Sequence, residues 1–163
     1  MQLITAKQVI DLCFTNKSTD TALIKDSFIE IAQEKHIRAV LGDDMYEEIV
    51  EQKNDDSLTE ANKLLLETYL QPALAFYTKL EVIMDMNINT TSQGLMINET
   101  EFSRAANSGE RADLKSTAQS HADTLRNKML KFLEDNIDDY DSYEIQGITT
   151  DTTFIGGIIM DND

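Results

Sequence analysis

The chain has 163 residues, of which 41% are hydrophobic and 27% are charged, and this composition favours a single globular domain over a disordered chain. No run of residues approaches the roughly 20 consecutive apolar positions that a membrane-spanning helix requires. The 30 acidic and 14 basic residues give a formal net charge of −16, which disfavours binding to nucleic-acid phosphates.

The N-terminal segment, residues 1–12, is amphipathic instead of a charged stretch followed by an apolar run. We therefore expect it to belong to the fold and not to act as a signal peptide. Thr5 is placed to cap a first short helix over residues 6–13. Cys13 is the only cysteine, so the chain has no internal disulfide, and its apolar neighbours indicate a buried core residue instead of a reactive thiol.

Two further helices are expected in the next part of the chain. The first covers residues 21–41, and its apolar residues face two sides, which indicates packing on both. Gly42 follows its C-terminus, where a left-handed backbone is needed. The next helix begins at Asp43 and Asp44, whose charges complement the N-terminal helix dipole, and ends at residues 54–57.

The strongest periodic signal in the chain predicts a central core helix over residues 59–87, with Thr59 as its N-cap. Aromatic residues at helical spacing, such as Tyr69, are interpreted as core. Pro72 lies inside this helix, and a proline there removes a backbone hydrogen bond and crowds the preceding turn. We expect a kink at residues 68–72 or a new helix start there.

The segment that follows, residues 87–107, is polar and predicts a loop or small hairpin, with a β-like piece at residues 95–97. A last long helix is expected over residues 110–136, with Leu114 and His121 on its packed face. The two long helices are expected to pack antiparallel.

The C-terminal part has a different composition, because residues 132–163 contain nine acids and no lysine or arginine. Residues 145–160 hold two β-branched pieces that we expect to be completed by the body of the protein or by strand addition to another chain. The predicted fold is mainly α: an antiparallel bundle of about five helices, residues 1–142, with a small hairpin or loop excursion, and an extended, β-prone tail, residues 143–163.

The sequence shows no catalytic motif, and we expect neither enzymatic activity nor a cofactor. His36 and His121 each lack the second histidine, three or four residues away, that a helical metal site usually has. The acidic stretch 135–144 alternates Asp139 and Asp141, but it lacks the glycine and the correctly spaced glutamate of a calcium loop. It is interpreted as a solvated helix end, and no metal ligand is assigned.

The order of four segments is distinctive. A helix ends in Leu-Gly and runs into an acidic, aromatic helix, AVLGDDMYEEIV. A leucine-rich helix follows with an embedded proline, LLLETYLQPALAFYTKL, and after it a glycine-hydrophobic step, SQGLMI. A final helix ends at KFLEDN, with Tyr140 just beyond. In this order, over about residues 25–143, the chain resembles the helical head–tail connector proteins, or neck adaptors, of tailed bacteriophages, especially the crAss-like phages that infect Bacteroides.

The resemblance implies a structural virion protein that is made in the host cytoplasm and located in the phage neck. Such proteins form a ring, commonly of twelve copies, between the portal and the tail, where the ring extends the DNA channel and supports tail attachment. The implied partners are further copies of the chain, the portal protein and other neck or tail proteins. Double-stranded DNA passes through without specific binding, and no membrane is involved.

Three regions are the expected subunit or portal contacts: the helix after Gly42, the excursion at residues 87–107, and the tail as a strand donor. The chain departs from the connector pattern in residues 87–91, which lack basic residues, and in the tail. The candidate contact residues are Asp43, Tyr46, Glu47, Gly94, Leu95, Met96, Ile145, Phe154, Ile155 and Ile158.

Two other interpretations stay open. An acidic helical binding module, either a DNA mimic or an inhibitor that captures a basic partner protein, rests on the net charge alone. A DNA mimic presents its acids as a broad surface, whereas the acids of this chain cluster towards the C-terminus. An enzyme that uses a carboxylate-bound metal is the third possibility, and no spacing of ligands supports it.

Overall fold

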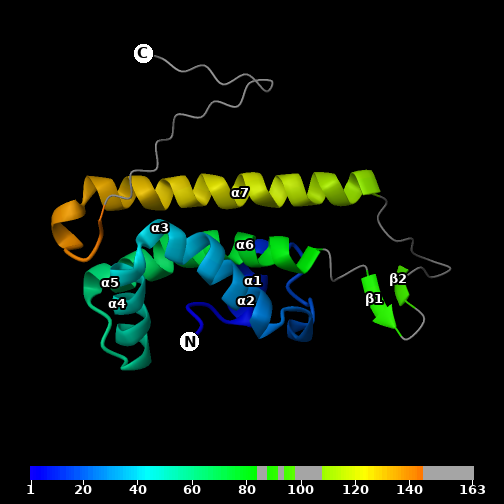
Figure 1. Ribbon diagram of the computed structural model, residues 1–163, viewed down its shortest axis with the longest axis horizontal. Helices are drawn as coiled ribbons and strands as arrows, with labels where there is room; N and C mark the ends of the chain where they lie inside the picture. The colour runs from blue at the N-terminus through cyan, green and yellow to red at the C-terminus, as the bar shows by residue number, and fades with distance from the viewer. Residues whose placement is uncertain (84–87, 92–93, 98–107, 145–163) are drawn as a thin grey trace, which may run out of the picture.

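The computed structural model describes residues 1–83, 88–91, 94–97 and 108–144 (Figure 1). Within these ranges the protein is mainly helical, with five continuous helices and one hairpin, which confirms the predicted helical bundle. The two longest helices run antiparallel and make the most extensive contact in the fold (Figure 1). The N-terminal helices pack against the other side of the central one of this pair.

The first helix, α1 (Ala6–Cys13), begins where the sequence predicts. The Thr5 side chain accepts a hydrogen bond from the Gln8 backbone N–H, while the Gln8 side chain accepts one from the Thr5 N–H, so two otherwise unpaired donors are satisfied. Ahead of the helix, Leu3 and Ile4 are fully buried. The prediction that the N-terminal segment belongs to the fold is therefore confirmed.

The second helix starts later than predicted. Asp20 accepts a hydrogen bond from the Ala22 N–H and closes a short 3₁₀ turn, η1 (Thr21–Leu23). Extended backbone at Lys25 separates this turn from α2 (Asp26–Ala32). The predicted start at residue 21 is wrong because a local side-chain hydrogen bond stabilises the turn in place of a continuous helix.

A π-helical segment explains why this helix is apolar on two sides. From α2 the chain continues through η2 (Gln33–Arg38) into α3 (Ala39–Leu41). Each residue inserted by a π turn rotates the following side chains by about 100°. As a result Ile29 before the segment and Ile37 within it are both fully buried, whereas Ile31 is 42% exposed.

Gly42 joins the second helix to α4 (Asp43–Asn54) in a conformation that other residues avoid. Its backbone has φ 81° and ψ 166°, a region populated almost only by glycine. The sharp turn lets α4 begin immediately, with Asp43 and Asp44 in its first turn as predicted.

The central helix runs without a break through α5 (Glu60–Leu64), η3 (Leu65–Leu70) and α6 (Gln71–Ile83), and Thr59 caps its start by accepting from the Asn62 N–H. The predicted distortion at Pro72 takes the form of a π segment. The Gln71 N–H donates to the Leu66 carbonyl, five residues back, which widens the turn just before the residue that has no N–H to donate.

The excursion between the long helices contains a hairpin, as predicted. Strands β1 (Ile88–Thr91) and β2 (Gly94–Ile97) pair antiparallel, with Ile88 opposite Ile97 and Thr91 opposite Gly94. The hairpin lies beyond the end of α6 (Figure 1).

The last long helix, α7 (Ser108–Asp135), packs along α6 through its second half. Its buried residues are Ala118, Ala122, Met129 and Leu133. Leu114 is 53% exposed, so the predicted packed face is wrong at this position. His121 is largely exposed, but its ring meets Phe76 of α6 edge to face at 5.2 Å, so it lies on the face that contacts α6. Leu114 continues the apolar spacing of the packed face, but it lies one turn before Ala118, the first buried residue of α7.

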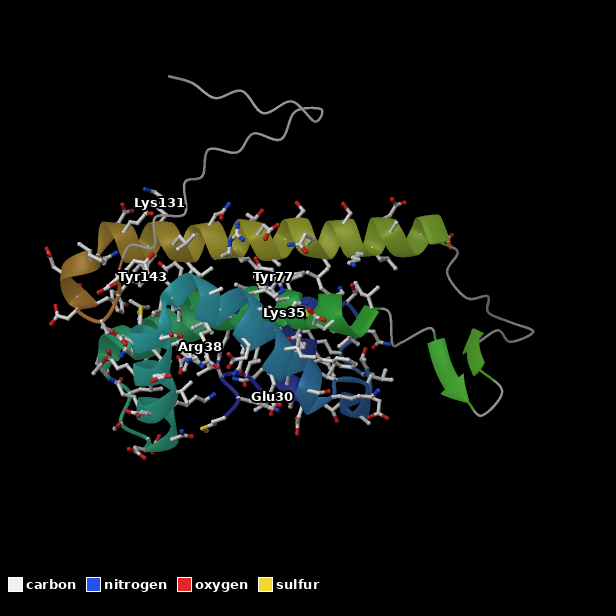
Figure 2. The ribbon with its side chains drawn as sticks, viewed as in Figure 1. Glu30, Lys35, Arg38, Tyr77, Lys131 and Tyr143 are labelled. Atoms are coloured by element: carbon white, nitrogen blue, oxygen red, sulfur yellow. The ribbon has the colours of Figure 1, made fainter. Side chains whose placement is uncertain are left out.

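After α7 the chain turns through η4 (Ile137–Asp139) and returns to the body. Tyr140 and Tyr143 are buried, and the Tyr140 hydroxyl donates to the Ala61 carbonyl at 2.9 Å. Tyr143 therefore belongs to the core, one residue past the predicted limit of the helical domain (Figure 2). The β-prone tail, residues 145–163, lies outside the described residues.

A Gly42→Ala substitution is expected to destabilise the fold by about 1–3 kcal/mol, because alanine is strained at this φ and ψ. Urea unfolding followed by circular dichroism measures the change. Gly109→Ala is the matched control: Gly109 lies inside α7, where alanine is the better helix former, so no loss is expected. Equal losses at the two glycines would contradict the assignment of strain to Gly42.

Candidate assembly surfaces

Two buried glutamines hold the N-terminal segment in the body. The Leu3 N–H donates to Gln33 Oε1 at 2.6 Å, and Gln33 Nε2 donates to the Met1 carbonyl at 3.2 Å. From the opposite helix, Gln71 Nε2 donates to the Leu3 carbonyl at 2.9 Å. Gln33 begins one π segment and Gln71 directly follows the other. The irregular backbone of residues 1–3 is thus paired with side chains instead of with other backbone groups.

The same network reaches α4. Gln33 Nε2 also donates to the Tyr46 hydroxyl at 3.1 Å, and Lys53 Nζ donates to the Gln2 carbonyl at 3.0 Å. Burial raises the pKa of Tyr46 and lowers the pKa of Lys53. Tyr46, a candidate contact residue, is only 6% exposed, so its side chain supports the surface from beneath instead of forming it.

The other candidate residues of α4, Asp43 and Glu47, are both paired with Arg38, which is labelled in Figure 2. Arg38 Nε lies 2.6 Å from Asp43 Oδ1, and Arg38 Nη2 lies 2.9 Å from Glu47 Oε1. The hydrogen bond that Arg38 donates to Asp43 is the main reason that the pKa of Arg38 is raised. Glu34 lies 3.6 Å from the same guanidinium. Asp43 and Glu47 are therefore exposed acids already bound to a cation, and they reinforce the turn at Gly42.

A small polar cleft of about 190 Å³ adjoins this cluster. It is lined by residues 41–44 on one side and by Ser142 and Glu144 on the other. The cleft brings the start of α4 against the end of the described chain, two acidic segments that are nearly 100 residues apart. It holds carboxylates and no cation, which disfavours anionic ligands.

The seam between α6 and α7 contains a buried polar contact. Tyr77, fully buried, donates its hydroxyl to Asp123 Oδ1 at 2.7 Å, and its ring stacks on His36 with centroids 3.9 Å apart (Figure 2). Burial lowers the pKa of His36 and raises the pKa of Tyr77. The contact links η2, α6 and α7, and the stacked histidine is structural.

A second aromatic cluster closes the other end of the seam. Tyr69 stacks on Phe132 at 4.1 Å, and Phe132 meets Tyr140 edge to face at 5.9 Å. The interpretation of Tyr69 as a core residue is consistent with its partly buried position against the core. These rings fix the turn after α7 against the start of the central helix.

The remaining candidate contacts are less closely placed. Gly94, Leu95 and Met96 form β2, where the backbone is described and the side chains are not. Ile145, Phe154, Ile155 and Ile158 lie outside the described residues. The structure therefore brings Asp43, Tyr46 and Glu47 together around Arg38 and leaves the other two regions as predictions.

Within residues 1–83 and 108–144, no three histidine, cysteine or carboxylate side chains form a group that could hold a metal ion. Cys13 is buried, and burial raises the pKa of its thiol to about 12. Its Sγ donates to the Val9 and Ala75 carbonyls. The thiolate is therefore negligible at neutral pH, as expected for a packing residue.

The early part of α7 is largely exposed. Residues 112–117 are all exposed, and Leu114 lies in a shallow hollow of about 440 Å³ with Glu110, Asp113 and Thr117. Packing against the core therefore contributes little to the stability of residues 112–117. No described helix is long and apolar enough to cross a membrane.

Sequence reasoning missed Gln33, Gln71 and Arg38. A buried glutamine gives no signal in the hydrophobic periodicity. Both glutamines bind Leu3, which lies 30 residues from Gln33 and 68 residues from Gln71 in the chain. The acids at residues 43 and 47 were recognised, but the cation between them was not. Arg38 is the last residue of a π segment and stands five residues before Asp43, with the turn at Gly42 between them. Helical spacing therefore does not predict their contact.

The fold and its surfaces define an acidic, mainly helical protein whose polar clusters hold its own elements together. The chain belongs to the family described as "Family of unknown function (DUF6712)", which matches residues 37–153 and thus well over half of its length. No curated protein and no solved structure matches the chain significantly.

A Gln33→Leu substitution is expected to lower the free energy of unfolding by at least about 2 kcal/mol, because buried groups of Met1, Leu3 and Tyr46 lose their partner. Tyr46→Phe removes one of these hydrogen bonds and leaves the others, so a loss of about 1 kcal/mol is expected. Urea unfolding of both variants gives the comparison. A Gln33→Leu protein as stable as Tyr46→Phe would show that the glutamine does not hold the N-terminal segment.

Proposed function

We propose that this protein is a structural subunit of a bacteriophage neck, in which about twelve copies form a ring between the portal and the tail. The ring extends the DNA channel and supports tail attachment. The partners are other copies of the chain, the portal protein and further neck or tail proteins. The protein acts in the virion and is not an enzyme.

The observation that carries this proposal is the exposure of residues 112–117 on α7. Six consecutive exposed residues, 112–117, extend a helix beyond the core that supports the rest of it. A polar helix that is exposed on all sides is marginal by itself, and contact with another protein stabilises it. This is the arrangement expected of a subunit whose packing is completed by its assembly.

The order of elements gives further support. The segments that carry the resemblance to neck adaptors are, in sequence, the α3–α4 junction at Gly42, the helix containing Pro72, the hairpin strand at Gly94 and the helix α7. The family match, residues 37–153, covers these same segments. The resemblance therefore concerns one continuous architecture and not isolated motifs.

The charge suits a DNA conduit. With a net charge of −16, the chain repels a polyanion at short range, which lets DNA pass without being held. The ion pairs around Arg38 use only a few of the acids, and the excess stays on the surface.

A second function is favoured by one observation. Residues 134–144 hold six acids and no base, and all but one of the six belong to the turn after α7 or to its last residues. Such a concentration suits capture of a basic protein by an acidic binding module. A basic partner recovered in a stoichiometric complex that salt dissolves, together with absence of the protein from virions, would favour this alternative over the neck ring.

The neck proposal is tested by electron microscopy of phage particles, with the protein identified in them by mass spectrometry. A ring between portal and tail that contains this chain is the expected result. Leu114→Asp is expected to reduce incorporation into particles several-fold, because a charge enters the projecting part of α7. Ile31→Asp alters a similarly exposed residue on α2 and is expected to be incorporated normally. Particles that assemble complete necks without the protein would overturn the proposal.

Deletion of residues 145–163 is expected to leave the helical body intact and to impair assembly, because the body described here closes with Tyr143. Circular dichroism and the melting temperature report on the body, and light scattering with particle yield reports on assembly. A truncated chain that loses its helical signal would instead assign the tail to the core.

A further inference from the structure

The hairpin of β1 and β2 stands apart from the helical body. Its two strands pair with each other beyond the end of α6, and no described helix packs extensively against either strand (Figure 1). A two-stranded hairpin alone is marginally stable in water, and a third strand or a helix against one face is what stabilises it. The residues that the structure describes supply neither of these.

The outer edges of this two-stranded sheet present backbone groups that no described strand pairs with. Along an antiparallel pair, residues that exchange hydrogen bonds with the opposite residue alternate with residues whose N–H and C=O groups point outward. Only two residues separate Thr91 from Gly94, so this pair is a hydrogen-bonded one. The next pair, Thr90 and Leu95, therefore directs its backbone groups to the two outer edges.

Neither edge has the features that usually prevent sheets from pairing. Soluble proteins protect their edge strands with charged side chains, prolines or bulges. Residues 86–98 contain no charged residue and no proline, in a chain where more than one residue in four is charged. The register is continuous from Ile88 opposite Ile97 to Thr91 opposite Gly94, so no bulge interrupts it. The hairpin is thus an open template for a further strand.

We propose that β2 of one copy pairs with β1 of the next copy, so that the hairpins of neighbouring copies form one continuous sheet. The inference rests on the proposed ring and names a contact between its subunits. Ring symmetry gives every copy of β1 the same direction relative to the ring axis. The β2 strand and the neighbouring β1 strand therefore run antiparallel, as the two strands do within one copy, and main-chain hydrogen bonds supply the affinity.

The lack of charge in the hairpin selects a second copy as the occupant. Two chains with a net charge of −16 repel each other. A contact through the hairpins places uncharged strands between the copies, and the acidic helical bodies stay further apart because the hairpin lies beyond the end of α6 (Figure 1). A basic foreign partner, by contrast, finds no carboxylate to bind in residues 86–98.

Head-to-tail pairing accounts for both edges at once. Because β1 and β2 are different surfaces, a copy that pairs through β2 keeps its β1 edge for the copy on its other side. Such a series closes into a ring when the rotation between neighbours permits, and the closed sheet has no open edge. Pairing of β1 with β1 would instead give dimers in which both β2 edges stay open.

The test uses two variants of the full chain, Thr90→Pro in β1 and Leu95→Pro in β2. Proline has no N–H, and an edge strand accepts it where the N–H faces outward, so each variant blocks one edge and keeps the hairpin. Each variant is expected to weaken self-association by about tenfold or more. Analytical ultracentrifugation over a range of concentrations and salt gives the masses, and circular dichroism reports on the helical body.

Mixing the two variants provides the sharpest comparison. Thr90→Pro keeps its β2 edge and Leu95→Pro keeps its β1 edge, so an equimolar mixture is expected to form dimers and nothing larger. Thr90→Val and Leu95→Val change the same side chains but keep the backbone N–H, and these matched controls are expected to associate as the wild type does. A mixture that stays monomeric would overturn the head-to-tail pairing.

The other outcomes separate this contact from its alternatives and from the neck function. A proline variant that still associates by itself would overturn the pairing, because its intact edge then binds the same strand of a second copy or a donor strand such as residues 145–163. Valine controls that fail equally, or a wild-type chain that is monomeric at every concentration and salt, would overturn it too. The function itself is decided by the location of the protein in particles.

Discussion

The rest of the structure depends on the burial of the central helix. In α6 the residues Ala73, Leu74, Ala75 and Tyr77 are fully buried although they follow one another around the helix. A helix that is buried on most of its sides needs partners on most sides, and α1, α2 and α7 supply them, while Pro72, Phe76 and Lys79 form a partly exposed side. Two alanines in this run let neighbouring backbones approach closely, as the hydrogen bond from Cys13 Sγ to the Ala75 carbonyl shows. The order of the other helices follows from this requirement.

The N-terminal segment that packs beside the central helix has buried backbone N–H and C=O groups that need hydrogen-bond partners. Residues 1–4 have irregular backbone and pack beside helices, and helices have no free backbone groups along their length to pair with them. Gln33 accepts a hydrogen bond from the Leu3 N–H and donates one to the Met1 carbonyl, and Gln71 donates one to the Leu3 carbonyl from the opposite side. A side-chain amide has separate donor and acceptor atoms for this purpose, whereas an ammonium group can only donate. Each of these glutamines adjoins a π segment, where an irregular turn redirects the side chains.

Features controlled by local chemistry were predictable from the sequence. The caps at Thr5 and Thr59, the turn at Gly42 and the distortion at Pro72 each depend on residues within one or two helical turns. Features controlled by distant contacts were not. Leu114 has the spacing of a buried residue, yet it is exposed because the packed part of α7 begins after it. Asp43, Tyr46 and Glu47 were named as candidate contact residues from the sequence, but the pairing of the two acids with Arg38 came only from the fold.

The placement of charge connects the fold to the proposed assembly. A compact chain with a net charge of −16 gains stability by spreading its acids, because like charges repel even when screened. This fold does the opposite, since the turn after α7 and the start of α4 meet at one cleft and the aromatic cluster of Tyr69, Phe132 and Tyr140 holds them there. Bringing acids together opposes folding of the isolated chain. A positively charged surface on a partner would relieve that repulsion. The electrostatic cost in a single copy is therefore the same interaction that, in the proposed assembly, favours contact with a partner.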